Sequence, residues 1–73
     1  MKYVECSVLL GAEVFTFSEV AVTLPNSGGS VTIWVEATVE NFRELLNSEL
    51  SFVKTDTDLY QFEVLFSAII RLR

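Results

Sequence analysis

Residues 3–22, YVECSVLLGAEVFTFSEVAV, consist of two runs of alternating apolar and polar residues that meet at Gly11-Ala12. Glycine at the first central position is typical of a two-residue type II′ turn, so this stretch predicts a β-hairpin. The turn sets the register of the hairpin, because it places Leu10 opposite Glu13. One face then carries only apolar side chains, namely Val4, Cys6, Val8, Leu10, Phe15 and Phe17.

The alternation changes phase after Ser18. Val20 and Val22 are apolar, whereas strict alternation from Phe17 would place the next apolar residues at 19 and 21. One extra residue near Ser18-Glu19 accounts for the change, so we expect a β-bulge there.

A third strand is expected after the turn-rich segment LPNSGGSV, residues 24–31. If Leu24 lies opposite Val31, both strands bury apolar residues on the same face, and this agreement supports the bulge. The expected buried pairs are Leu24 with Val31, Val22 with Ile33, and Val20 with Val35. The same register places Thr32, Trp34 and Glu36 on the outer face.

Residues 38–50, TVENFRELLNSEL, change to the spacing of an amphipathic helix. Thr38 is a suitable N-cap, because its hydroxyl can accept a hydrogen bond from a free N–H of the first turn. Glu49 interrupts the apolar stripe, so the helix is expected to end by Ser48. A partly buried, functional Glu49 is the alternative. The stripe expected to face the sheet consists of Val39, Phe42, Leu45, Leu46 and Leu50.

The remaining residues predict a short strand near 52–55, a polar turn, and a long strand over 59–73. Alternation in the long strand predicts a buried face of Tyr60, Phe62, Val64, Phe66, Ala68, Ile70 and Leu72. Leu59, Leu65 and Ile69 then lie on the outer face and need another cover. The predicted fold is one α+β domain, residues 1–73. It has a mainly antiparallel, twisted sheet of about five strands with one helix on one face, in the order βββαββ.

Length and charge limit the class of protein. A chain of 73 residues, 51% of them hydrophobic, can fold as one domain, but its core is small, so we expect self-association as a dimer or higher oligomer. Ten acidic and five basic residues give a net charge of −5. This charge repels nucleic acids and anionic membranes and favours a basic protein partner.

Other features indicate the cytoplasm. The single cysteine excludes an intrachain disulfide. The N-terminal residues lack the pattern of a signal peptide, because Glu5 interrupts their apolar run. No apolar run approaches the roughly 18 residues of a membrane span.

No residue cluster indicates catalysis, and we expect no enzyme activity, no cofactor and no metal. The chain has no histidine, which removes the commonest general base and metal ligand. Cys6 is expected to be a packed thiol on the buried face. NSGGS at 26–30 lacks the Lys and the helix of a phosphate-binding loop, and Asp56 and Asp58 lack the other ligands of a calcium loop.

Trp34 is the leading candidate for partner binding. A tryptophan on the outer face of a sheet is a large amphipathic surface of the kind enriched where partner proteins bind. The candidate residues of this face are Trp34, Tyr3, Leu65 and Ile69. The leading function is therefore a non-enzymatic interaction module that self-associates or binds a partner through an apolar sheet face around Trp34. An outer face with scattered apolar residues and no binding role is the simpler interpretation.

The acidic residues suggest an alternative function. Glu36, Glu40 and Glu44 recur every four residues, and if Glu36 enters the helix they form a carboxylate stripe with about 6 Å between neighbours. Such a stripe could occupy the basic groove of a nucleic-acid-binding protein and inhibit it. Arg43 interrupts the stripe, and a solvated helix face is the simpler interpretation. A small ligand or catalytic pocket is the third class, but so short a chain can barely enclose one.

Overall fold

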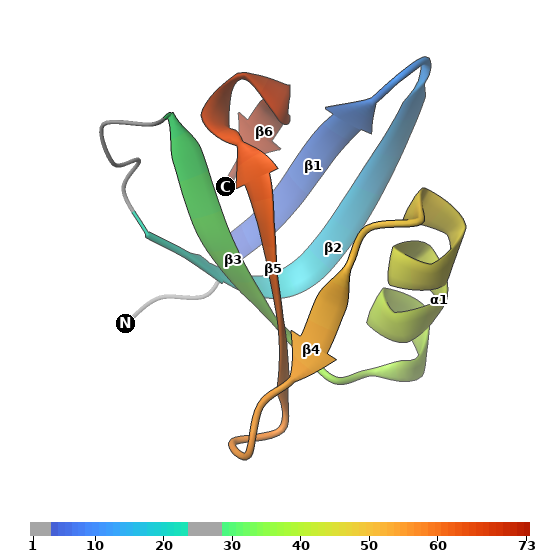
Figure 1. Ribbon diagram of the computed structural model, residues 1–73, viewed down its shortest axis with the longest axis vertical. Helices are drawn as coiled ribbons and strands as arrows, with labels where there is room; N and C mark the ends of the chain where they lie inside the picture. The colour runs from blue at the N-terminus through green and yellow to red at the C-terminus, as the bar shows by residue number, and fades with distance from the viewer. Residues whose placement is uncertain (1–3, 24–28) are drawn as a thin grey trace.

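The computed structural model describes residues 4–23 and 29–73 (Figure 1). Tyr3, Leu24 and residues 25–28 of the predicted turn lie outside the described residues. The elements are β1 (Val4–Leu10), β2 (Glu13–Val22), β3 (Ser30–Glu36), α1 (Val39–Ser48), β4 (Phe52–Lys54), β5 (Leu59–Leu65), the short 3-10 helix η1 (Phe66–Ala68) and β6 (Ile69–Leu72). The strands form one antiparallel sheet with the order β4-β5-β3-β2-β1-β6. The predicted α+β class is confirmed, with the helix after the third strand.

The hairpin of β1 and β2 has the predicted register. Leu10 pairs with Glu13 and Cys6 pairs with Phe17. Of the two central turn residues, only Gly11 has a positive φ, of 63°, as the first position of a type II′ turn requires. The turn chemistry therefore sets the pairing of these strands.

The predicted bulge is present in β2. Cys6 pairs with Phe17, but Val4 pairs with Val20, so β2 has one extra residue between these pairs. Glu19 lies in this bulge and has a left-handed backbone conformation, with φ of 57°. The phase change keeps Phe17 and Val20 both buried, as the sequence pattern indicated.

The sheet curls at the bulge of β2, where pairing with β3 begins. Residues before it pair with β1 alone, Val20 pairs with both Val4 of β1 and Val35 of β3, and Ala21 and Val22 pair with β3. Figure 1 shows β2 bending between these two neighbours. On the other side of β3, β5 pairs with β3 and β4. The three residues of η1 connect β5 to β6, and β6 pairs with β1. The curled sheet encloses the core.

The core is apolar and contains one helix residue. The rings of Phe17 and Phe62 lie 5.1 Å apart between their centroids, and Leu45 of α1 is fully buried. The buried hydrophobic residues are Cys6, Val8, Phe15, Phe17, Val20, Val31, Ile33, Val35, Leu45, Phe62 and Val64.

The prediction for the long final strand is wrong after Leu65. The chain forms η1 there instead of continuing as a strand, and the turn changes the phase of the alternation. Ile69 consequently packs against the core, although we expected it on the outer face. Phe66, Ile70 and Leu72, which we expected to be buried, are 52%, 52% and 48% exposed. The strand ends because its partner β3 begins at Ser30, and the next residue donates its N–H to the carbonyl of Gly29.

The ends of α1 are as predicted. The N–H of Asn41 donates to the Thr38 hydroxyl over 3.1 Å, which makes Thr38 the N-cap. The helix ends at Ser48, and Glu49 follows in a left-handed conformation with φ of 60°. Glu49 is exposed, so the alternative of a partly buried Glu49 is wrong.

The predicted buried stripe of α1 is largely wrong. Among the helix residues Asn41 and Leu45 are buried, whereas Val39, Phe42 and Leu46 are 66%, 40% and 55% exposed. Three hydrogen bonds of the Asn41 side chain explain this rotation of the helix. Its Oδ1 accepts the N–H of Ser18 over 3.3 Å, and its Nδ2 donates to the carbonyls of Ser18 over 3.1 Å and of Glu36 over 2.8 Å.

Candidate functional site

Trp34 lies in a row of residues across the outer face of the sheet. It pairs with Ala21 of β2 on one side and Gln61 of β5 on the other, and Gln61 pairs with Val53 of β4. Trp34 is half-buried, and its indole N–H donates to Gln61 Oε1 over 3.2 Å. The only polar atom of the ring therefore has a partner inside the protein.

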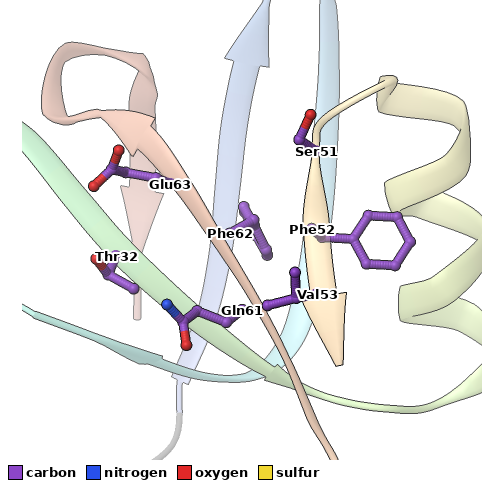
Figure 2. A pocket seen from close by; sticks show the side chains of 7 residues that line it. All are labelled: Thr32, Ser51, Phe52, Val53, Gln61, Phe62 and Glu63. Atoms are coloured by element: carbon purple, nitrogen blue, oxygen red, sulfur yellow. The ribbon is translucent and has the colours of Figure 1, made fainter. Parts of the chain in front are cut away.

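An open hollow of about 310 Å³ lies on the sheet near this row. Figure 2 shows Thr32, Gln61 and Glu63 on one side of it, and the Phe52 ring pointing away from them toward α1. Its side-chain polar groups are the Glu63 carboxylate, the Gln61 amide and the hydroxyls of Thr32 and Ser51. These groups can exchange hydrogen bonds with a peptide or with water, but they include no strong nucleophile.

The structure separates the predicted partner-binding residues. Leu65 is 60% exposed and pairs with Ser30, so it lies four residues along β5 from Gln61, about 13 Å away. The polar pair of Thr32 and Glu63 lies between Leu65 and the Trp34 row. Ile69 faces the core, and Tyr3 lies outside the described residues. The outer face around Trp34 is therefore not one continuous apolar surface.

The predicted carboxylate stripe is also incomplete. Glu36 is the last residue of β3 and does not enter α1. Glu40 is exposed on the helix, while Glu44 Oε2 accepts the backbone N–H of Thr16 over 3.3 Å. Only Glu40 and Glu44 thus follow helical spacing, and Glu44 has a structural contact with β2.

The first surface that the sequence analysis missed is on α1. Val39, Phe42 and Leu46 are exposed at helical spacing, and we call these three residues the helix patch. The Phe42 ring lies 6.0 Å from Phe52 and 5.8 Å from Tyr60, so the patch continues into an aromatic cluster. The apolar spacing of these residues was visible in the sequence, but we assigned it to the core.

The second surface is formed by the segment from the end of β5 to β6, and of its residues the sequence analysis named only Leu65 as a binding candidate. Leu65, Phe66, Ile70 and Leu72 are 60%, 52%, 52% and 48% exposed, and we call these four residues the C-terminal patch. Arg71 and Arg73 are exposed within and beside it. Arg71 pairs with Ser7 and Leu72 pairs with Cys6, so the arginines lie on the other face of β6 from Leu72. The exposed apolar side chains themselves are the candidate for binding another protein.

The other reactive groups offer no alternative site. Cys6 is fully buried, and burial raises the pKa of its thiol to about 11, so the thiol is protonated at neutral pH. Residues 4–23 and 29–73 contain no group of three or more His, Cys, Asp or Glu side chains that could hold a metal ion. The surfaces described above are therefore the candidate sites.

Comparison with protein families, with curated proteins and with solved structures finds no match to this chain. The helices in the described part of the chain are all too short or too polar to cross a membrane.

Proposed function

We propose that this protein is a non-enzymatic interaction module that binds another protein chain, either a second copy or a different protein. The helix patch and the C-terminal patch are its binding surfaces. The single cysteine cannot form an intrachain disulfide, and this supports a role in the cytoplasm.

The observation that carries this proposal is the exposure of large apolar side chains. Ten of them are at least 40% exposed in the described part of the chain, against eleven hydrophobic residues in the core. Single exposed apolar residues are ordinary, but groups of them usually mark a binding surface. Seven of these ten residues belong to the two patches.

Trp34 has a smaller part in this proposal than the sequence suggested. Its ring is half-buried, and its N–H is already bonded to Gln61. Val39 and Leu46 expose more than half of their surface. Burial of the two patches by a partner therefore removes more apolar surface from water than burial of Trp34 alone, and this removal drives association.

The acidic inhibitor has less support than the interaction module. It depended on three carboxylates along one helix, but Glu36 belongs to β3 and Glu44 is bonded to Thr16. Glu40 keeps its exposed position on α1. Replacing it with Gln would weaken binding to a basic groove without affecting a contact that is mainly apolar.

Two surface variants test the proposal. The helix-patch variant carries Val39→Gln and Leu46→Gln, and the C-terminal-patch variant carries Ile70→Thr and Leu72→Thr. Val14→Gln is the matched control, because Val14 is 52% exposed on the hairpin, outside both patches. Association is measured by sedimentation for self-binding and by recovery of one defined protein from the source cells for foreign binding.

We expect at least one patch variant to lose association while it melts like the wild type, and we expect Val14→Gln to behave like the wild type. Removing exposed apolar side chains leaves the core intact, so folding should not change. Unchanged association in both patch variants would refute the proposed function.

A further inference from the structure

The hollow on the outer face of the sheet contains a cross-strand pair of polar side chains. Glu63 of β5 pairs with Thr32 of β3, so the two side chains lie next to each other on that face. The next row of side chains on one side is bulkier and consists of Val53, Gln61 and Trp34. On the other side, Leu65 follows Glu63 on the same face of β5. The polar pair therefore lies between two rows with larger side chains.

The Trp34 indole fixes the orientation of the Gln61 amide. An indole N–H can only donate, so the atom that accepts it over 3.2 Å is Gln61 Oε1. The amide nitrogen of Gln61 is then left to donate, and Figure 2 shows this nitrogen on the Thr32 side of the amide oxygen. The hollow thus has one amide donor, one carboxylate acceptor at Glu63, and the hydroxyls of Thr32 and Ser51.

Glu63 gives the hollow its charge. None of the other six lining residues ionises at neutral pH. Among residues 4–23 and 29–73 the one ion pair joins Lys54 to Asp58, so no cation in this part of the chain neutralises Glu63. Lys54 pairs with Tyr60, which lies on the other face of β5 from Glu63. The net charge of −5 adds a general attraction for cations.

We propose that this hollow binds an arginine or lysine side chain of a partner protein, with the cation at Glu63. The cation donates to the carboxylate and to the hydroxyls beside it. Val53 is 61% exposed and provides apolar surface for the methylene groups of the bound side chain. The Gln61 nitrogen donates to a backbone carbonyl of the same partner segment.

Other occupants fit the hollow less well. An anionic group would be repelled by Glu63 and by the net charge of the chain. An apolar side chain would remove the carboxylate and the hydroxyls from water without giving them new partners, which is unfavourable. A basic side chain satisfies these groups and still packs its methylene groups on an apolar neighbour.

This inference goes beyond the proposed function, because none of the seven lining residues belongs to the helix patch or to the C-terminal patch. The hollow would read the charge of a partner, whereas the two patches bury apolar surface. The two contacts can therefore be tested separately.

NMR titration of the isotope-labelled protein with the peptide acetyl-Gly-Arg-Gly-amide tests the inference. The matched probe carries citrulline in place of arginine, because citrulline has nearly the same shape without the charge. We expect the arginine peptide to shift the signals of the Glu63 amide, the Gln61 side-chain amide and the Trp34 indole. The citrulline peptide should bind about two- to fivefold more weakly, which is the range for an ion pair in contact with water.

Variants of the carboxylate identify its role. Glu63→Gln should weaken binding of the arginine peptide by the same factor. Glu13→Gln should bind like the wild type, because Glu13 is an exposed carboxylate on the hairpin outside the hollow. Glu63→Lys should no longer bind the arginine peptide and should bind acetyl-Gly-Glu-Gly-amide instead. Spectra of the free variants that match the wild type away from the hollow show that the fold is kept.

Three results would overturn the inference. Equal binding of the arginine and citrulline peptides would show that charge is not recognised, and unchanged binding by Glu63→Gln would show that Glu63 is not the acceptor. Shifts confined to residues outside the hollow would place the peptide elsewhere. The helix-patch and C-terminal-patch variants keep Glu63, so their results decide the proposed function independently of this one.

Discussion

Replacing Asn41 with Ala should remove the attachment of α1 to the sheet. The Asn41 side chain is 2% exposed and bonds to the backbone of Ser18 and to the carbonyl of Glu36. The substitution leaves one N–H and two carbonyls without these partners in a partly buried region. Each lost hydrogen bond costs about 0.5–1.5 kcal/mol, so three cost about 1.5–4.5 kcal/mol.

Helix propensity offsets a small part of this loss. Alanine is more favourable than asparagine inside a helix by about 0.5 kcal/mol, so we expect a net destabilisation of about 2–3 kcal/mol. That is a large fraction of the stability of a domain of this size, which is on the order of 5 kcal/mol. Leu45, the buried helix residue in the core, would also lose its fixed position.

Urea unfolding followed by circular dichroism measures the effect of Asn41→Ala as a change in unfolding free energy. Asn47→Ala is the matched control, because Asn47 is exposed on the same helix. The control should be neutral or slightly stabilised. An Asn41→Ala variant within about 0.5 kcal/mol of the wild type would show that the hydrogen bonds of Asn41 do not hold α1, since surface changes have effects of that size.

Three further predictions concern the core, the outer face and pH. Phe17→Ala removes a fully buried ring that packs on Phe62, so it should lower the unfolding free energy by about 3–5 kcal/mol and abolish cooperative melting. A near-native melting curve would refute the assigned core. Trp34→Ala should leave the fold intact at a cost of about 1–2 kcal/mol, because the side chain is half-buried and the variant loses the hydrogen bond to Gln61. Unfolding of the variant in calorimetry would place Trp34 in the core. Burial raises the pKa of Cys6 from 9.0 to about 11, so its contribution to stability is complete below pH 9 and is lost as the pH rises toward 11. The unfolding free energy of Cys6→Ala, measured with denaturant, should therefore fall less steeply over this pH range than that of the wild type. An equal fall in both proteins would contradict the burial of the thiol.

The hairpin and the bulge were predictable from sequence because their determinants are local. Gly11 fixes the turn, and the alternation of apolar residues before and after Ser18 shows where one residue must be added. A slip of one residue would expose the whole apolar face of β1. Few other registers are therefore compatible with these residues.

The end of the last strand was not predictable because alternation alone does not show where a partner strand ends. Phe66, Ile70 and Leu72 fit a period of two, but β3 offers no partner beyond Ser30. The chain then forms η1 and changes its neighbour from β3 to β1. Only the pairing of distant strands decides this point.

The prediction of which face of α1 is buried was wrong for a different reason. The apolar spacing of Val39, Phe42 and Leu46 competes with three hydrogen bonds of Asn41 to backbone groups of β2 and β3. The free groups on β2 arise at the bulge, far from Asn41 in sequence, so no pattern within the helix reveals them. Tertiary contacts thus outweighed the local period and left the helix patch exposed.

Sedimentation velocity of the wild-type chain over increasing concentration is the most direct test of the central claim, that the exposed patches bind another protein chain, for the case in which that chain is a second copy. We predict that species larger than the 8.2 kDa monomer increase with concentration and that the helix-patch variant sediments as a monomer under the same conditions. A wild type that remains at 8.2 kDa at every concentration up to about 0.1 mM, where even weak association with Kd of about 10 μM would be evident, would contradict the claim.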